Sequence, residues 1–184
     1  MNMPGQPGTA TARALAADAI ESLLDAAKPV NQICQELAQV FKVRATEVAL
    51  LQLQNGLLRF LFPEELKTTG AIPISSASTV AAHTAATRKT ELFNNFLRVQ
   101  HARIFESVKL EGSANSEPQE QPPIQKLISA PIVDNQRRVL GVIQICRKGP
   151  DASTCGADFT LEDLRRLELV AKSLAKVGFM QNAS

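Results

Sequence analysis

Hydrophobic residues recur every three or four positions in the first quarter of the chain, which is the spacing of one face of an α-helix. One such stripe runs over residues 12–27, and a second over residues 30–41 includes Ile33 and Leu37. Pro29 lies between them, and a proline ends one helix and fits the first turn of the next. The pattern therefore predicts two consecutive helices.

The period then shortens, and continuous apolar runs typical of strands follow. Residues 48–53 and 57–62 form two such runs, and the dipeptide Asn55-Gly56 lies between them. Asn-Gly is the strongest short hairpin signal, because both residues of the turn take a positive φ. Residues 71–74 are expected to form a short edge strand, since their proline cannot donate to a ladder.

The middle of the chain is expected to be mainly helical. Residues 76–88 predict a helix with Ser75 or Ser76 as its N-cap. Apolar spacing also favours two short helical pieces within residues 91–110. Residues 111–125 have no hydrophobic period and are rich in proline, glutamate and glutamine, so they predict a long mobile loop.

The last third of the chain predicts a second hairpin and a closing helix. Residues 127–133 and 139–146 are strand-like, and residues 149–157 form a further loop. Thr160 and Asp163 have the spacing of a capping box, and the helix they open has an apolar stripe that runs to residue 178. Because hairpins and not βαβ crossovers join the strands, we expect an α/β sandwich of the α+β type. Its sheet would be antiparallel, with five or six strands flanked by helices.

Composition narrows the class of protein. The chain has 184 residues, 45 % of them hydrophobic, and a formal net charge of +2. We expect residues 1–10 to be a flexible tail and residues 11–180 to be one domain. The near-neutral charge argues against a nucleic-acid partner, and no apolar run is long enough for a membrane helix. Without a signal peptide at the N-terminus, a cytoplasmic location is expected.

Few residues offer reactive chemistry. The three cysteines, Cys34, Cys146 and Cys155, are widely spaced, so we expect no metal site and no disulfide framework. Cys155, beside Gly156, is the expected exposed thiol. Nucleophilic catalysis needs a serine or cysteine beside a positioned base, and neither His83 nor His101 lies in a recognisable motif, so we expect no catalytic residues and no enzymatic activity.

The closing third resembles the GAF domain family. The resemblance rests on three segments: 128–132, 139–145 and 159–164, the last with the sequence Phe-Thr-Leu-Glu-Asp-Leu. Two strands, a loop and a helix opened by Phe-Thr-x-x-Asp are the usual end of such a domain, and the earlier elements follow in the expected order. The resemblance implies a single stand-alone GAF domain that binds a small molecule or dimerises, with the ligand or cofactor unknown.

Cyclic-nucleotide GAF domains carry a further motif, of which this chain keeps a part. Lys148, Phe159 and Asp163 match its lysine, phenylalanine and aspartate, while Arg147 replaces its asparagine and Leu164 its last glutamate. The resemblance implies a Lys148–Asp163 pair. Helix capping is the alternative role for Asp163.

Two other subfamilies do not match. Bilin-binding GAF domains carry a Cys-His pair, which is absent from this chain. Free methionine sulfoxide reductases of this fold use cysteines beside an aromatic-rich pocket, and this chain has no Trp and no Tyr.

The family's ligand pocket would lie between the sheet and residues 79–105. The polar residues assigned to this pocket are Thr79, His83, Thr84, Asn94, Asn95, Arg98, His101 and Arg103, and Phe105 adds an aromatic side chain. The Asn94-Asn95 pair is the most suggestive, because buried amides need hydrogen-bond partners that a ligand can supply. The alternative is that these amides turn or cap the chain.

Three functions stay open from the sequence. The first is a sensory module that binds a small molecule without transforming it and signals through dimerisation or a partner protein. The second is an interaction module without a ligand, a homodimer formed through its terminal helices. The third is a thiol-based redox sensor or residual enzyme that uses Cys155.

Overall fold

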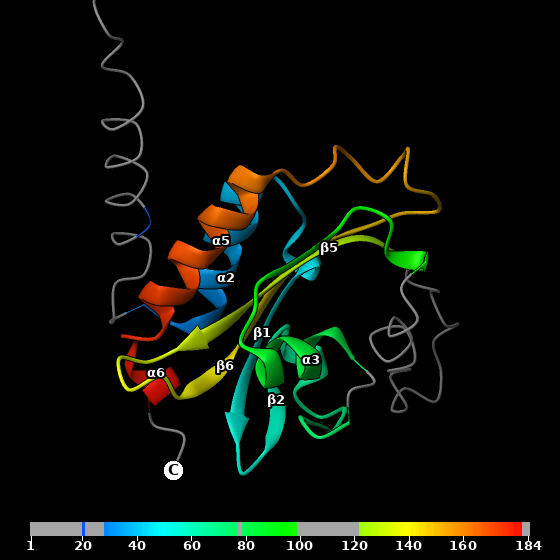
Figure 1. The fold of residues 1–184 in the computed structure, drawn as a ribbon. Helices are drawn as coiled ribbons and strands as arrows, with labels where there is room; N and C mark the ends of the chain where they lie inside the picture. Colours follow the sequence, from blue (N-terminus) through cyan, green and yellow to red (C-terminus); the bar gives the residue numbers. More distant parts are fainter. Residues whose placement is uncertain (1–19, 21–27, 77–78, 99–121, 182–184) are drawn as a thin grey trace, which may run out of the picture.

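Six antiparallel strands form one sheet among the residues described by the computed structural model, which are 20, 28–76, 79–98 and 122–181. The strands are β1 (Val48–Gln54), β2 (Leu57–Phe62), β3 (Ala71–Pro73), β4 (Glu91–Phe93), β5 (Ile124–Val133) and β6 (Val139–Lys148). Their order in the sheet is β3-β2-β1-β6-β5-β4. Helices flank this sheet, so the expected α+β class and strand number are confirmed (Figure 1).

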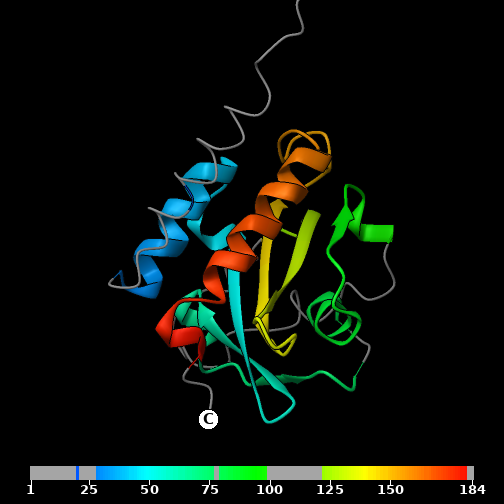
Figure 2. The same ribbon diagram turned by 60° about the vertical axis from the view of Figure 1, so that its left-hand side comes forward.

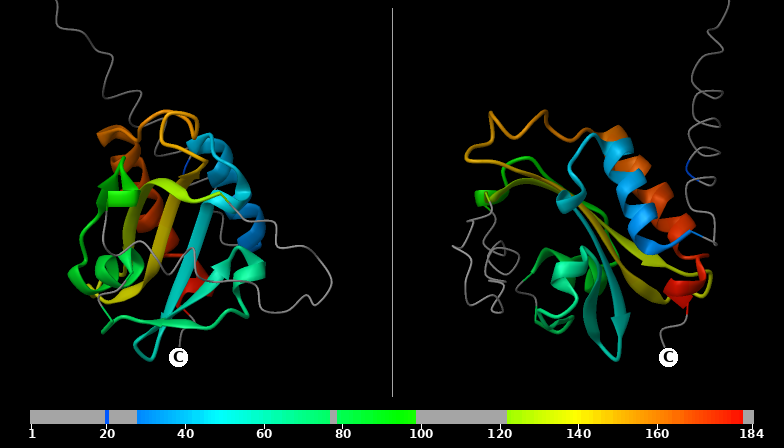
Figure 3. Two further views of the ribbon diagram at one scale, coloured as in Figure 1. Left: turned by 90° about the vertical axis from the view of Figure 1, so that its right-hand side faces the viewer. Right: turned by 180° about the vertical axis from the view of Figure 1, so that it is seen from behind.

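The helices lie on both faces of the sheet. They are α2 (Val30–Phe41), α3 (Val80–Thr87), α5 (Leu161–Leu174) and α6 (Gly178–Gln181), with single turns η1 (Ala45–Glu47), η2 (Glu64–Leu66) and η3 (Phe96–Arg98). Helices α2 and α5 cover one face, here called the helix face (Figure 2). Helix α3 covers the opposite one, here called the α3 face (Figure 3).

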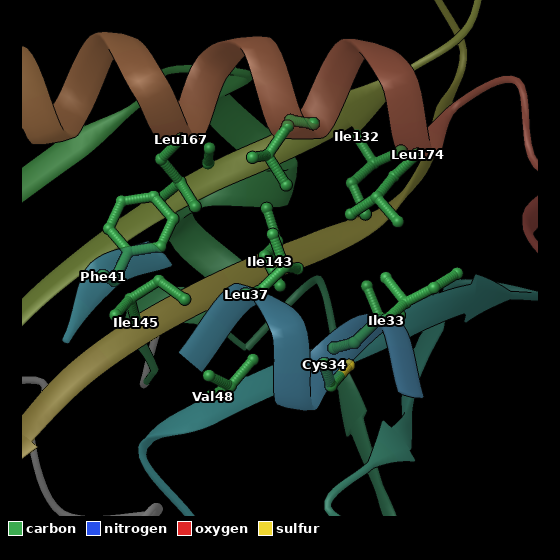
Figure 4. Packing of buried hydrophobic residues seen from close by; sticks show 14 of the residues in the cluster. Ile33, Cys34, Leu37, Phe41, Val48, Ile132, Ile143, Ile145, Leu167 and Leu174 are labelled. Atoms are coloured by element: carbon green, nitrogen blue, oxygen red, sulfur yellow. The ribbon is translucent and has the colours of Figure 1, made fainter. Parts of the chain in front are cut away.

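The helix face holds the main core. Ile33, Leu37 and Phe41 of α2 and Leu167 and Leu174 of α5 point toward the central strands (Figure 4). All of these side chains are buried. This packing follows from the apolar stripe of α2, which faces the sheet as its period predicts.

Several predicted elements are confirmed by the structure. Asn55 and Gly56 have φ values of 50° and 75°, and they close the β1–β2 hairpin. Thr160 and Asp163 form the capping box of α5.

Gly141 lies in β6 against β1, where an added Cβ would collide with the Leu51 carbonyl, so only glycine fits at this position.

Other predictions are wrong at element boundaries. Residues 91–93 are the edge strand β4 and not helix, although η3 follows them. Helix α3 begins after Thr79, which caps it, and not after Ser75 or Ser76. Strand β5 begins at Ile124, so it takes in the last two residues of the predicted loop. Helix α5 ends at Leu174, and α6 is a separate element.

Parts of three predicted segments lie outside the described residues. They are the tail at 1–10, the loop at 111–121 and residues 99–110 of the segment expected to be helical. Of the predicted helix 12–27, only Ile20 is described, and it is buried in the core of the helix face.

Candidate functional site

A row of polar side chains crosses the α3 face. Glu91 of β4 pairs with Ser129 of β5, and Ser129 pairs with Gln144 of β6. Residues directly opposite each other on neighbouring strands point to the same face, so the three side chains lie in line across the sheet. Thr84 of α3 lies against this row, with its hydroxyl 2.8 Å from Ser129 Oγ. We call these four residues and His83 the polar row.

The strand period explains why the row faces α3. Along β6, Val142 and Cys146 lie on the same face as Gln144, while Ile143 and Ile145 pack into the core of the helix face. Ser129 and Gln144 are therefore polar residues at positions where the neighbouring strand residues are apolar. Both are almost completely buried.

The hydrogen bonds of the row run in one direction. Thr84 Oγ1 donates to Glu91 Oε2 over 2.8 Å, and His83 Nδ1 lies 2.9 Å from Glu91 Oε1. The single hydrogen of the Thr84 hydroxyl is used in the bond to Glu91, so Ser129 must be the donor in its bond to Thr84. Ser129 Oγ in turn accepts from Gln144 Nε2, which is 3.1 Å away. Every donor therefore points toward the Glu91 carboxylate, and such chains reinforce one another in a buried setting.

One end of the row is left without a partner. The network places the Gln144 amide nitrogen on Ser129 and so fixes the orientation of the amide. Gln144 Oε1 then lies buried with no hydrogen-bond partner in the described part of the chain. A buried acceptor of this kind costs about 1–3 kcal/mol unless a donor reaches it. At the other end, the His83 side chain is 44 % exposed, so the row connects the surface with the interior.

Two of the predicted site residues have structural roles. The Thr79 hydroxyl accepts a hydrogen bond from Ala82 N over 3.0 Å as the N-cap of α3. The Asn94 amide donates to the Phe159 carbonyl (2.9 Å) and accepts from Phe159 N (2.8 Å). Asn94 therefore holds the β4 end against the segment that leads into α5. Its neighbour Asn95 is exposed.

His83 belongs to the polar row, where it contacts Glu91. The remaining predicted pocket residues, His101, Arg103 and Phe105, lie outside the described residues.

The three motif residues lie at the end of β6 (Lys148), just before α5 (Phe159) and in the first turn of α5 (Asp163). Asp163 Oδ2 accepts hydrogen bonds from Thr160 N (2.8 Å) and Thr160 Oγ1 (2.9 Å), which is the capping role. Phe159 is buried, and the Arg147 guanidinium lies over its ring, 4.8 Å from the centroid. The Lys148 backbone N–H donates to the buried Glu47 carboxylate.

The cysteines differ in their surroundings. Cys34 and Cys146 are buried, and burial raises the pKa of both thiols to about 12, which disfavours the reactive thiolate. Cys155 is half-buried, with Sγ 3.5 Å from the Ala152 carbonyl oxygen. Among the described residues, no group of His, Cys, Asp and Glu is placed to hold a metal ion. No described helix is long and apolar enough to cross a membrane.

Sequence reasoning missed Glu91, Ser129 and Gln144. A signal for the last two was present, because each is a single polar residue inside an apolar strand: Leu-Ile-Ser-Ala-Pro and Val-Ile-Gln-Ile-Cys. Only the register of the sheet shows that these positions are adjacent.

The profile of the GAF domain family matches residues 25–177 of the chain. No curated protein matches the sequence. Among solved structures, the GAF domain of an Acinetobacter phosphoenolpyruvate-protein phosphotransferase is similar with a TM-score of 0.64 and 14 % identity. That match covers 95 % of this chain and 96 % of the other.

Two further structures share the fold. Residues 122 to 287 of a methyl-accepting chemotaxis protein match with a TM-score of 0.56 and 14 % identity, over 87 % of this chain and 92 % of that one. The fRMsr of Staphylococcus aureus in its reduced form matches with a TM-score of 0.53 and 16 % identity, over 95 % and 98 % of the two chains. At these identities the likeness concerns the fold alone.

Proposed function

Because this chain belongs to the GAF domain family, we propose that it is a non-catalytic regulatory module that binds a small molecule on its α3 face. The single observation that carries the proposal is the unpartnered carbonyl oxygen of Gln144. The ligand would donate a hydrogen bond to this oxygen and so remove the cost of burying it alone. The signal would leave through dimerisation or a partner protein.

The polar row supports a binding role because it is rigid. Thr84 and Ser129 are fully buried, and each has its hydroxyl in two hydrogen bonds of the chain. A side chain fixed by its neighbours presents its remaining polar atom in one position, which favours a specific ligand. The regulatory part of the proposal is supported by the similar structures of a phosphotransferase GAF domain and of part of a methyl-accepting chemotaxis protein.

A ligand-free interaction module is the second candidate. It is favoured by Thr79 and Asn94, two predicted ligand residues whose polar side-chain atoms form hydrogen bonds with the backbone of the chain. In that case the chain would act as a homodimer or adaptor, and the Gln144 oxygen would remain unpaired.

Native mass spectrometry of the protein purified from its own cells separates the two candidates, because it measures bound mass and oligomeric state together. We expect a discrete added mass on the parent chain and its loss in Gln144→Met, which has a similar volume but no acceptor. The substitution should change the free energy of unfolding by less than about 1 kcal/mol, since it removes one hydrogen bond and one unpaired oxygen.

The matched control is Gln52→Met. Gln52 is also buried in a central strand, but both ends of its amide have partners: Nε2 donates to the Phe179 carbonyl, and Oε1 accepts from Gln54. This variant should keep the added mass. A dimer without added mass in the parent would favour the interaction module, and an added mass that persists in Gln144→Met would refute the assignment of Gln144.

A further inference from the structure

A hollow lies at the end of the sheet where α2 stops and β6 ends. It is an open groove of about 530 Å³. Its lining comes from the residues after α2, from η1, from the residue before β5, and from the end of β6 with the loop that follows. These residues are Lys42, Val43, Arg44, Glu47, Pro122, Arg147, Lys148, Gly149, Pro150, Thr154, Cys155 and Gly156. Cavities of this size hold small molecules. We call it the basic groove.

The charge of the basic groove is strongly positive. Among the described residues, Lys42, Arg44, Arg147 and Lys148 line it, and Glu47 is the single acidic one. The Glu47 carboxylate is already neutralised within the chain. It accepts hydrogen bonds from the Arg44 side chain (2.8 Å), the Arg44 backbone (2.8 Å) and the Lys148 backbone (2.7 Å).

The acidic residues of the following loop do not cancel the excess. Asp151 accepts hydrogen bonds from Ser153 and Thr154 within its own turn. Asp158 pairs with the buried Lys126 over 2.8 Å. Neither aspartate lines the groove. The groove therefore presents an excess of positive charge to a molecule that enters it.

Arg147, one of the lining residues of the basic groove, is held in place by its neighbours. Its Nη1 donates to the Lys42 carbonyl over 3.1 Å, at the carbonyl end of α2, where a cation is favourable. Its guanidinium stacks on the Phe159 ring. Its Nε is buried and has no hydrogen-bond partner in the described part of the chain. Nη2 lies 3.4 Å from the Phe41 carbonyl, and each Nη atom keeps a second N–H, so the fixed guanidinium can still donate to an oxyanion.

We propose that the basic groove binds the phosphate group of a phosphate-bearing small molecule, with Lys42 and Arg147 as contacts. A multiply charged oxyanion matches several cations better than a single carboxylate does, and arginine suits phosphate in shape and in hydrogen bonding. No residue of the polar row lines this groove, so the site is separate from the one proposed on the α3 face.

The test is a nitrogen-15 NMR titration of the whole chain with sodium pyrophosphate at constant ionic strength. We expect a saturable shift of the Arg147 Nε–H signal and of the Gly149 and Gly156 amides. Lys42→Asn should weaken binding about five-fold by removal of one cation. Lys42 is the C-cap of α2 with φ 53°, a conformation that asparagine tolerates, so the variant should fold.

Arg88→Asn is the matched control. Arg88 is the C-cap of α3, also with a positive φ of 57°, and it is exposed outside the groove. Its substitution should leave the affinity unchanged. Three results would overturn the proposal: no saturable shift, equal weakening in both variants, or equal binding of the dicarboxylate malonate, which would exclude selectivity for phosphate.

Discussion

The two faces of the sheet are packed in different ways although the same strands form both. On the helix face, α2 and α5 bury one continuous apolar cluster. On the α3 face, the apolar side chains form two smaller clusters, and the polar row lies between them. Along β6, Val142 belongs to one of these clusters and Cys146 to the other, with Gln144 between them.

The difference follows from the helices that cover each face. Helix α2 presents large side chains such as Ile33 and Leu37, whereas α3 is short and rich in alanine. Small side chains fill less volume and bury less apolar surface, so α3 contributes less hydrophobic stabilisation. The helix face therefore carries more of the stability of the fold, and the α3 face buries polar side chains at positions that apolar ones could fill.

The largest effect is expected on the helix face. Leu167→Ala should lower the free energy of unfolding by about 3 kcal/mol, because Leu167 is 0 % exposed and its removal leaves a cavity in the main core. Urea unfolding measures the change. The control is Leu161→Ala, also on α5 but 68 % exposed, which should have little effect. Similar losses in the two variants would contradict the core assignment.

An intermediate effect is expected on the α3 face. Thr84→Val keeps the volume but removes the hydroxyl that joins Glu91 and Ser129, which should cost about 2 kcal/mol in urea unfolding. Thr87→Val is the control, because the Thr87 hydroxyl donates only to the His83 carbonyl at an exposed position. Its cost should stay below about 0.5 kcal/mol. If Thr84→Val were equally mild, the polar row would not act as a connected network.

The smallest effect concerns Glu47 at the end of the sheet. Burial by itself would raise the pKa of the Glu47 carboxyl, but hydrogen bonds from Arg44 and Lys148 outweigh it and hold the pKa below its ordinary value of 4.5. A lowered pKa stabilises the fold fully above pH 4.5, and this stabilisation is lost as the pH falls through the folded-state pKa. Glu47→Gln should therefore cost about 1 kcal/mol at pH 7 and less in acid.

Urea unfolding of the parent and of Glu47→Gln at pH 7, 5 and 3.5 measures this difference. Other carboxyl groups with lowered pKa values, such as Glu36 and Asp134, cancel in the comparison because both proteins contain them. Glu168→Gln, an exposed change on α5, is the control. A difference in unfolding free energy between the parent and Glu47→Gln that grows toward low pH would contradict a lowered pKa of Glu47.

The sequence was sufficient where the signal is local. The Asn55-Gly56 turn depends on the φ preferences of two adjacent residues, and the Thr160–Asp163 capping box depends on side chains three positions apart. The apolar stripe of α2 follows from the spacing of its own residues, whichever apolar surface it packs against. Each of these features follows from interactions within a few residues of the chain, and the structure has all three.

The helical prediction was wrong for residues 91–93, because the helical spacing of Leu92 and Phe96 is coincidental. Leu92 packs against the core of the helix face from strand β4, while Phe96 belongs to a cluster on the α3 face. Residues on one stripe of a helix would contact the same core. A strand of three residues is also too short to show a clear alternation of polar and apolar positions.

The sequence by itself determined the family, the order of most elements and the apolar face of α2. The tertiary structure decided where the polar groups meet. Glu91, Ser129 and Gln144 are far apart in the chain, and strand register alone places them in one row. Likewise, Asn94 bonds to the Phe159 backbone, 65 positions away. Hydrogen bonds act over about 3 Å, so their partners are fixed only when distant segments pack together.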